Sequence, residues 1–421
     1  MITIQDKHLC CGCEACVNAC PKHCISFKED EEGFRYPQVD QSVCIDCGLC
    51  EIVCPVLNQA DPQKLLSVYA AKNSNEEELL KSSSGGIFIL LAKLVLHQGG
   101  VVFGAKFDEN WNVIHAYAET EGDTQAFIGS KYVQSRIGNT YTQAKGFLKQ
   151  GRKVLFSGTP CQIAGLKQFL GKEYDNLLTV DVICHGVPSP KVWQRYIDEI
   201  KGNAFKKEKT IYYPIYYPHA TGTSTDVQIE SIYFRDKRTG WKKYSFTLSL
   251  AETLADGPKN TVSLSHKYHK DSYMKLFLRD LILRPSCYQC PAKGGKSQSD
   301  LTIADFWGVE RCYPDLVDER GVGLMVIKSG KGLKAMSLLQ LELQKVSFED
   351  AIAGNPMYMN SVSEPQNRNK CFRLINNSNK SLDKIIEILF RPPLLFRVKQ
   401  KIKRFRGFLT TVCRKPHHNN H

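Results

Sequence analysis

A cysteine spacing that occurs twice near the N-terminus constrains the fold more than any other feature. Residues 10–21 read CCGCEACVNACP and residues 44–55 read CIDCGLCEIVCP, and both contain the pattern C-x2-C-x2-C-x3-C-P. Each cysteine of the second pattern lies 34 residues after its counterpart, as Cys44 follows Cys10. Such a duplication predicts two half-units that complete each other's sites.

The spacing has a chemical reason. Two intervening residues let a tight loop carry successive thiolates around one face of an iron–sulfur cube, and soft thiolate ligands suit iron and sulfide. In two-cluster ferredoxins the fourth cysteine of each run binds the other cluster, and the duplicated register disfavours a zinc array. We therefore predict two [4Fe-4S] clusters, the first held by Cys10, Cys13, Cys16 and Cys54 and the second by Cys44, Cys47, Cys50 and Cys20.

The residues around these runs fit the same small domain. Pro21 and Pro55 hold the preceding cysteines away from helical geometry. The segment 25–36 predicts a small hairpin whose aromatic side chains shield a cluster. Cys11 and Cys24 fall outside the repeated register, so we interpret them as packing residues.

Composition narrows the class of protein. A chain of 421 residues predicts two or three domains. It has no apolar run long enough to span a bilayer and no apolar signal segment, so we expect a cytoplasmic protein. In a reducing cytosol, the clustered cysteines among its seventeen are expected to be metal ligands or redox groups and not disulfides. A net charge of +13 suits an acidic protein, an anionic cofactor or a membrane surface; without a zinc-finger, RNP or basic-aromatic pattern, nucleic acid is the weakest partner.

Beyond residue 62, short apolar runs alternate with longer helical ones, which is an α/β pattern. The predicted strands are 67–71, 101–106, 154–157, 178–183, 229–235, 301–305 and 324–328. The predicted helices are 87–97, 142–150, 162–170, 190–201 and 331–339.

Two turns before predicted helices are candidate sites. The SSSGG run at 82–86 precedes an apolar helix whose free N–H groups suit a phosphate, although a serine N-cap followed by flexible glycines explains the same residues. The GTPCQ run at 158–162 places Cys161 at a helix N-terminus, where the helix dipole stabilises a thiolate. A buried, inert cysteine is the alternative there.

Three further cysteines change the interpretation of Cys161. Cys184 follows the next predicted strand, and the carboxyl ends of neighbouring strands meet at one edge of an α/β sheet. We hypothesise that Cys161 and Cys184, together with the close pair Cys287 and Cys290, bind a third [4Fe-4S] cluster. The alternative is a redox nucleophile at Cys161 with a separate zinc or structural pair. His185 is a candidate proton relay, although a lone histidine is more often structural.

These motifs resemble the coenzyme F420 hydrogenase/dehydrogenase beta-subunit family, which includes iron–sulfur flavoproteins and plant hydroxymethyl-chlorophyll reductases. Five segments carry the resemblance, in the family's order over about residues 66–330. They are SSSGGIF at 82–88, GSKYVQS at 129–135, GTPCQIAG at 158–165, DVICHG at 181–186, and 287–308, which ends in DFWG.

The resemblance implies an FAD in the α/β body beside a [4Fe-4S] cluster held by the four later cysteines. No G-x-G-x-x-G fingerprint is present, so the flavin follows from the resemblance and not from spacing. A flavin exchanges one or two electrons, whereas clusters exchange one. The implied FAD contacts are Ser83, Ser84, Gly85, Gly86, Lys131, Ser135, Thr159 and Gln162, and the implied cluster ligands are Cys161, Cys184, Cys287 and Cys290.

We therefore predict an α+β ferredoxin-like domain at 1–60, an α/β mixed-sheet flavoprotein domain at 66–345 and a basic amphipathic tail at 386–421. The expected function is an oxidoreductase that passes electrons between a ferredoxin-like or hydrogenase/dehydrogenase partner, the clusters, FAD and a deazaflavin or other small molecule. The alternative is a non-catalytic electron-transfer subunit that docks to a partner enzyme. The tail suits an anionic membrane or a partner, and equally a helix packed on its own domain.

Overall fold

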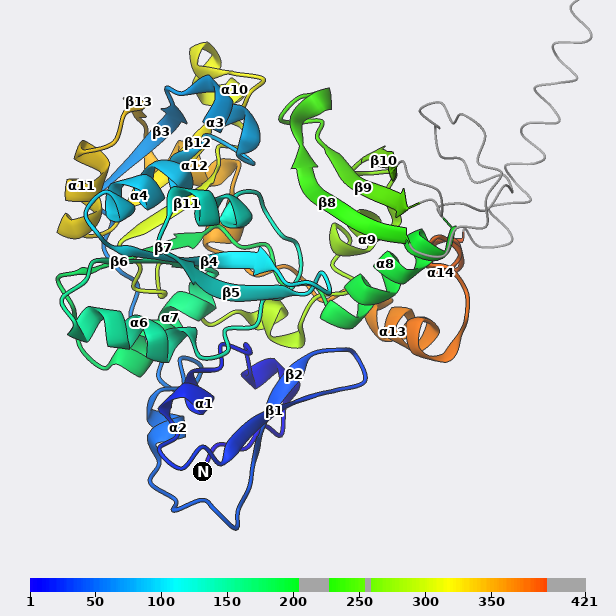
Figure 1. The fold of residues 1–421 in the computed structure, drawn as a ribbon, viewed down its shortest axis with the longest axis horizontal. Helices are drawn as coiled ribbons and strands as arrows, with labels where there is room; N and C mark the ends of the chain where they lie inside the picture. Colours follow the sequence, from blue (N-terminus) through cyan, green and yellow to red (C-terminus); the bar gives the residue numbers. More distant parts are fainter. Residues whose placement is uncertain (204–226, 254–258, 392–421) are drawn as a thin grey trace, which may run out of the picture.

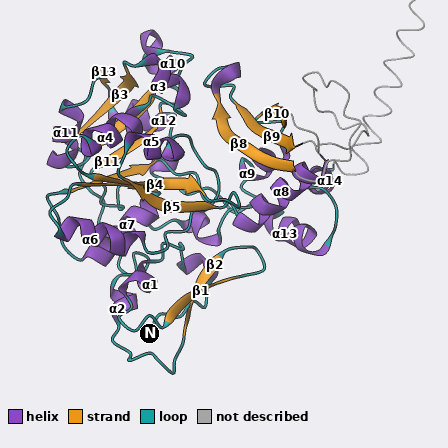
Figure 2. Cartoon of the chain, viewed as in Figure 1, coloured by secondary structure: helices purple, strands orange, loops and turns teal. Residues whose placement is uncertain are grey.

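A computed structural model of the chain describes residues 1–203, 227–253 and 259–391. They form an N-terminal unit, a central sheet covered by helices on both faces, and a lobe beside one end of that sheet (Figure 1; Figure 2). In the described part of the chain, no helix is long and apolar enough to cross a membrane. The predicted basic helix after residue 391 lies outside the described residues.

The N-terminal unit consists of two short helices and a hairpin. Helix α1 (Ala15–Ala19) begins after Glu14 and α2 (Leu49–Ile52) begins after Gly48, both in the left-handed conformation. Strands β1 (Ile25–Glu29) and β2 (Arg35–Val39) pair antiparallel, so the predicted hairpin is confirmed. The two cysteine runs therefore form equivalent loop-and-helix turns, as their duplication predicts.

The central sheet is mixed, with four parallel strands in its middle. From one edge to the other its order is β13 (Leu341–Lys345), β3 (Ser67–Asn73), β12 (Gly323–Ile327), β11 (Leu301–Asp305), β7 (Leu177–Val182), β6 (Val154–Gly158), β4 (Val101–Phe107) and β5 (Val113–Ala118). Strands β11, β7, β6 and β4 run parallel, and the remaining pairs are antiparallel. The parallel carboxyl ends therefore meet at one edge.

Alternating residues of these strands build two cores. Phe103 and Phe156 face α6 (Thr140–Lys149) and α7 (Pro160–Leu170), whereas Val102 and Leu155 face the helices on the opposite side. Helix α1 of the N-terminal unit packs against α6 and α7, so this unit covers the first side (Figure 1). The other helices of the body are α3 (Glu76–Lys81), α4 (Ile87–Leu96), α5 (Glu121–Thr124), α10 (Val309–Cys312), α11 (Gly330–Ser337) and α12 (Phe348–Ala353).

The lobe contains a three-stranded antiparallel sheet and its own apolar core. Trp193 is one of the fully buried side chains of this core, and Phe34 of the N-terminal unit packs into it. The elements of the lobe are α8 (Pro190–Asn203), β8 (Val227–Asp236), β9 (Ser245–Thr253), β10 (Lys259–Lys267), α9 (Ser272–Phe277), α13 (Arg368–Asn377) and α14 (Leu382–Leu389).

All seven predicted strands and all five predicted helices are present, with ends that differ by at most two residues. The predicted strand at 229–235 lies in the lobe's own sheet and not in the α/β sheet. Strands β5, β9, β10 and β13 were not predicted, because they are short, polar or interrupted by charged residues. Helices α12 to α14 continue the folded chain beyond residue 345.

Candidate functional site

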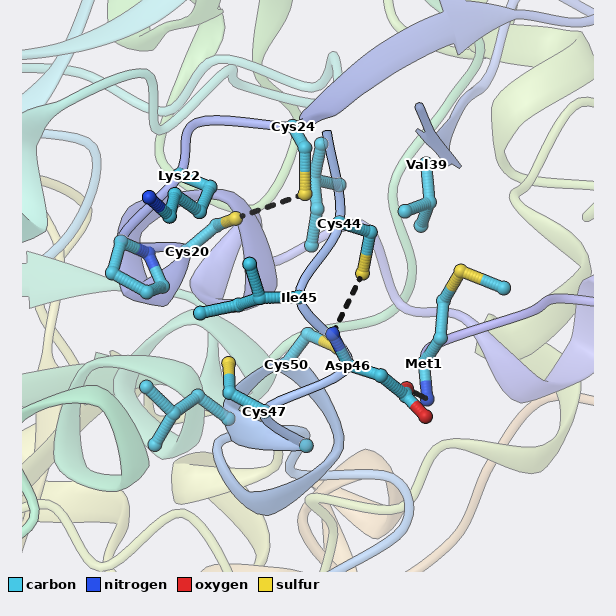
Figure 3. Close-up of a pocket in the computed structure, with 14 residues that line it drawn as sticks. Met1, Cys20, Lys22, Cys24, Val39, Cys44, Ile45, Asp46, Cys47 and Cys50 are labelled. Atoms are coloured by element: carbon cyan, nitrogen blue, oxygen red, sulfur yellow. Dashed lines mark hydrogen bonds and ion pairs between the residues drawn. The ribbon is translucent and has the colours of Figure 1, made fainter. Parts of the chain in front are cut away.

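Four of the eight repeated cysteines surround one hollow at the end of the N-terminal unit that lies away from the sheet (Figure 3). Backbone N–H groups donate to two of their sulfurs, from Ile2 to Cys50 at 3.3 Å and from Asp46 to Cys44 at 3.4 Å. Hydrogen bonds to sulfur of this kind accompany iron–sulfur clusters. Cys47 is exposed, so the hollow opens to solvent. These residues are called the outer cysteine group: Cys20, Cys44, Cys47 and Cys50.

The other four repeated cysteines lie deeper, between the hairpin and the central unit. None of them is more than 9% exposed, and their sulfurs interact electrostatically with one another. Their loop lies so close to α7 that a Cβ added at Gly165 would be 3.0 Å from the Cys13 sulfur. These residues are called the inner cysteine group: Cys10, Cys13, Cys16 and Cys54.

The cysteines outside the register are buried, as expected for packing residues, but each also contacts a cysteine group. The Cys24 sulfur lies 3.4 Å from that of Cys20. The Cys11 thiol lies within hydrogen-bonding reach of Cys161. Among the residues that the structure describes, no three His, Cys, Asp or Glu side chains are arranged to hold a single metal ion, as a tetrahedral zinc site requires.

The four later cysteines come together from three segments of the chain. Cys161 is the second residue of α7, Cys184 follows β7, and Cys287 and Cys290 belong to a 3-10 turn and its end. Their sulfurs interact electrostatically, Cys184 with both Cys161 and Cys290, and Cys287 with Cys184. The Val187 N–H donates to the Cys287 sulfur at 3.4 Å. These four residues are called the third cysteine group.

A cavity of about 530 Å³ lies at the carboxyl edge of the parallel strands, next to the third cysteine group. Its size falls within the range of about 300–1,000 Å³ that is usual for ligand sites. Cys184 and His185 line it. So do all eight residues implied to contact FAD: Ser83, Ser84, Gly85, Gly86, Lys131, Ser135, Thr159 and Gln162.

The SSSGG run forms one wall of this cavity, and its local structure differs from the interpretation as a serine N-cap with flexible glycines. Gly86, not a serine, is the N-cap of α4, with φ of +71°, and Ser82 ends α3 instead. Gly85 must be glycine because an added Cβ would lie 2.3 Å from the Ala71 carbonyl. Ser83 Oγ accepts a hydrogen bond from the Ser130 N–H at 2.8 Å. The run is therefore fixed by its neighbours and not flexible.

A second wall is a hydrogen-bonded set at the start of α7. Gln162 Oε1 accepts from the Thr159 N–H at 2.9 Å, and Gln162 Nε2 donates to Ser135 Oγ at 2.9 Å. Pro160 occupies the first helical position, as predicted. Thr159 Oγ1 also lies 3.3 Å from the Cys161 sulfur. This set links the cavity wall directly to the third cysteine group.

Lys131 is the cationic side chain among the implied FAD contacts. Its ammonium donates to the carbonyls of Ile128 at 3.2 Å and Gly129 at 3.1 Å. Burial lowers the pKa of Lys131 to about 7, because desolvation disfavours its charged form. A bound phosphate would restore the charge.

His185 does not stand alone in the cavity. Its Nε2 lies 2.6 Å from Asp280 Oδ1, and its ring packs edge-on against Phe277 at 5.3 Å. A carboxylate partner of this kind orients an imidazole and fixes its tautomer. Nothing in the sequence pointed to Asp280, which is 95 residues away in the chain.

Sequence reasoning also missed three polar residues of the cavity. Arg235 and Asp305 form a nearly buried pair with N–O distances of 2.7 and 2.9 Å. His115, on the unpredicted strand β5, donates from Nε2 to the Ser157 carbonyl at 3.0 Å, and burial lowers its pKa to about 4. Asp305 lies in the DFWG motif, whereas Arg235 lies in a segment that carries no motif.

Comparisons with known proteins match both parts of the chain. Residues 9–58 match the 4Fe-4S dicluster domain, and residues 151–349 match the family described as the C terminus of the coenzyme F420 hydrogenase/dehydrogenase beta subunit. Residues 151–349 of the chain belong to this beta-subunit family. The chain also carries an N-terminal iron–sulfur domain, which the spacing of its cysteines predicted, and the family resemblance stated from the sequence is confirmed.

Two curated relatives are similar over part of their length. The coenzyme F420-dependent sulfite reductase of Methanocaldococcus jannaschii is 26% identical over 39% of this chain and 26% of its own length. The F subunit of the F(420)H(2) dehydrogenase of Methanosarcina mazei is 26% identical over 38% of this chain and 48% of its own length. The chain thus spans about a quarter to a half of these relatives.

One solved structure is also similar, from the F420-reducing [NiFe] hydrogenase complex of Methanosarcina barkeri. It is 17% identical, covers 70% of this chain and 92% of its own, and has a TM-score of 0.40. The match to the dicluster domain shows that the chain is an iron–sulfur protein. Together with the family match, it supports a role in electron transfer alongside oxidoreductases.

Proposed function

We propose that the chain is an iron–sulfur flavoprotein oxidoreductase that holds three [4Fe-4S] clusters and one FAD. The observation that carries this proposal is the cavity, because it gathers every residue that the resemblance implies for FAD, with Cys184 and His185 beside them. The cluster sites are the outer, inner and third cysteine groups. The N–H donors to Cys44, Cys50 and Cys287 fit thiolate ligands of such clusters.

The three cysteine groups form a series from solvent to the cavity. The outer group is partly exposed, and the inner group is buried against α7. Cys11 follows Cys10 and lies beside Cys161, so the inner and third groups are neighbours. We propose that the outer group is the port for a redox protein partner, since it is the group of the three that contains an exposed cysteine, Cys47.

Residues of the cavity would hold a flavin by its anionic and apolar parts. The free N–H groups at the start of α4 and the Lys131 ammonium suit a pyrophosphate. Tyr244, Phe277 and Trp307 offer aromatic surface. When bound, a flavin converts between single-electron and two-electron transfer. His185, oriented by Asp280, is the group proposed to hold and deliver a proton.

The substrate is proposed to be a small redox molecule, with a deazaflavin as the first candidate. The names of both curated relatives refer to coenzyme F420, which supports this choice. The net charge of +13 suits an anionic coenzyme or an acidic protein partner.

Anaerobic purification followed by iron, acid-labile sulfide and flavin analysis tests the proposal. We expect about twelve iron atoms and one FAD per chain, as three four-iron clusters require. Replacing Cys161 by Ser should lower the iron to about eight while the first two clusters remain. A wild-type protein with about eight iron atoms and no flavin would instead support a non-catalytic electron-transfer subunit, and unchanged iron in the Cys161→Ser variant would reject the third site.

A further inference from the structure

Arg284 is a buried cation placed between two cysteine groups. Its side chain is 0% exposed. The guanidinium donates to the Cys10 carbonyl at 2.7 Å and to the Cys10 sulfur at 3.4 Å. Further bonds reach the Arg35 carbonyl at 3.0 Å and Gln134 Oε1 at 3.1 Å. Arg284 also precedes Cys287 by three residues, and its charge interacts with that sulfur.

Among the described residues, no Asp or Glu forms an ion pair with this guanidinium. Its electrostatic neighbours are Tyr36, the sulfurs of Cys10, Cys11 and Cys287, and the buried Glu14, whose own ion pair at 3.5 Å is with Arg35. A fully buried charge is costly unless a counter-charge compensates it. The thiolates and cluster of the inner cysteine group supply negative charge at this position. The residues therefore fit a negatively charged group that Arg284 contacts directly.

The surrounding chain is built to keep Arg284 in place. The guanidinium lies over the Tyr36 ring, 4.3 Å from its centre, and over the Phe34 ring at 5.6 Å. Gly12 has φ of +70°, and a Cβ there would come within 2.8 Å of Arg284 Nη1. The glycine inside the first cysteine run is thus required by Arg284 as well as by its own turn.

We propose that Arg284 raises the reduction potential of the cluster held by the inner cysteine group, and so directs electrons inward from the outer cluster. The proposal rests on the ligand assignment proposed above. In the step concerned, a one-electron reductant gives one electron to the cluster and no bond forms or breaks. The cluster with its four thiolates becomes one unit more negative, and a fixed cation hydrogen-bonded to a ligand sulfur stabilises that reduced state.

Potentiometric titration of the anaerobic full-length protein, followed by electron paramagnetic resonance, tests this. Each signal is assigned beforehand with Cys16→Ser and Cys47→Ser, which alter the inner and the outer cluster. In Arg284→Gln we expect the equilibrium constant for reduction of the inner cluster to fall at least about tenfold, which lowers its reduction potential by about 59 mV for one electron. The potential of the outer cluster should be unchanged. Arg284→Lys, which keeps the charge, should give less than half of that shift.

An unchanged potential of the inner cluster in Arg284→Gln, or equal shifts of the inner and outer clusters, would overturn the role of Arg284. Equal shifts in Arg284→Gln and Arg284→Lys would also overturn it, because a purely structural arginine would be lost equally in both variants. If Arg284→Gln does not assemble its clusters, Gln134→Glu gives Arg284 a rival counter-charge at 3.1 Å and must lower the inner potential. A wild-type protein without a cluster at the inner group would refute the ligand assignment instead, which is a separate result.

Discussion

Replacing Gly165 by alanine tests the contact between the N-terminal unit and helix α7. An alanine Cβ would lie 2.9 Å from Cys13 Cβ, 3.0 Å from its sulfur and 3.1 Å from the Tyr141 hydroxyl. Carbon contacts are optimal at about 3.5–4.0 Å, so the Cys13 loop must move away from α7. Overpacking of this kind costs about 1–3 kcal/mol, and the better helix propensity of alanine returns about 1 kcal/mol.

The chain offers a matched control in the neighbouring helix. Gly146 lies inside α6, and a Cβ added there meets nothing within 4 Å. Gly146→Ala should therefore stabilise the protein by up to about 1 kcal/mol. We expect the anaerobic unfolding midpoint of Gly165→Ala to be below that of Gly146→Ala, with only the inner-cluster signal altered. Equal midpoints with unaltered cluster signals would refute the close packing of this loop on α7.

Three further predictions concern the cavity. Lys131 is largely neutral above pH 7 in the free protein and is charged beside a phosphate, so FAD binding takes up a proton. The affinity for FAD, measured by equilibrium dialysis, should therefore fall as the pH rises above about 7, by at most about tenfold per pH unit. In Lys131→Met the affinity for FAD should be independent of pH over this range. Asp305→Asn leaves Arg235 buried without its carboxylate and should lower the free energy of unfolding by about 3–5 kcal/mol. The control Glu77→Gln, which breaks an exposed pair with Lys81, should cost about 0.5 kcal/mol or less. Similar losses in the two variants would contradict the importance of the buried pair. His185→Phe should keep its iron and flavin but reduce turnover of a two-electron acceptor by about 10²–10⁴-fold, with one-electron dye reduction retained; loss of both activities would argue against a proton-transfer role.

The features that the sequence revealed are those encoded by local spacing. The duplicated cysteine runs, the hairpin between them and the turn from β6 into α7 depend on neighbouring residues, and all three have the expected form. The proximity of Cys161 and Cys184 could be predicted, because the carboxyl ends of parallel strands lie at one edge of a sheet and these residues come shortly after the adjacent strands β6 and β7. Their proximity to Cys287 depended on the resemblance, because no local pattern joins residues so far apart.

The features that stayed hidden are contacts between distant segments. Arg284 is an ordinary arginine in the sequence, and only the fold brings it to Cys10, 274 residues away. Asp280 and Arg235 likewise gain their meaning from partners on other elements. Cys11 was treated as a packing residue because it breaks the register, yet its thiol meets Cys161. Strand β5 reads VIHAYA, a short and mostly apolar run between two turns, and this signal could have located His115.

Anomalous diffraction at the iron edge, from crystals grown anaerobically, tests the central claim most directly. We predict three iron peaks, at the outer, inner and third cysteine groups, and flavin density in the cavity between the SSSGG run and Lys131. Two peaks confined to the N-terminal unit, with no flavin density in that cavity, would contradict this account.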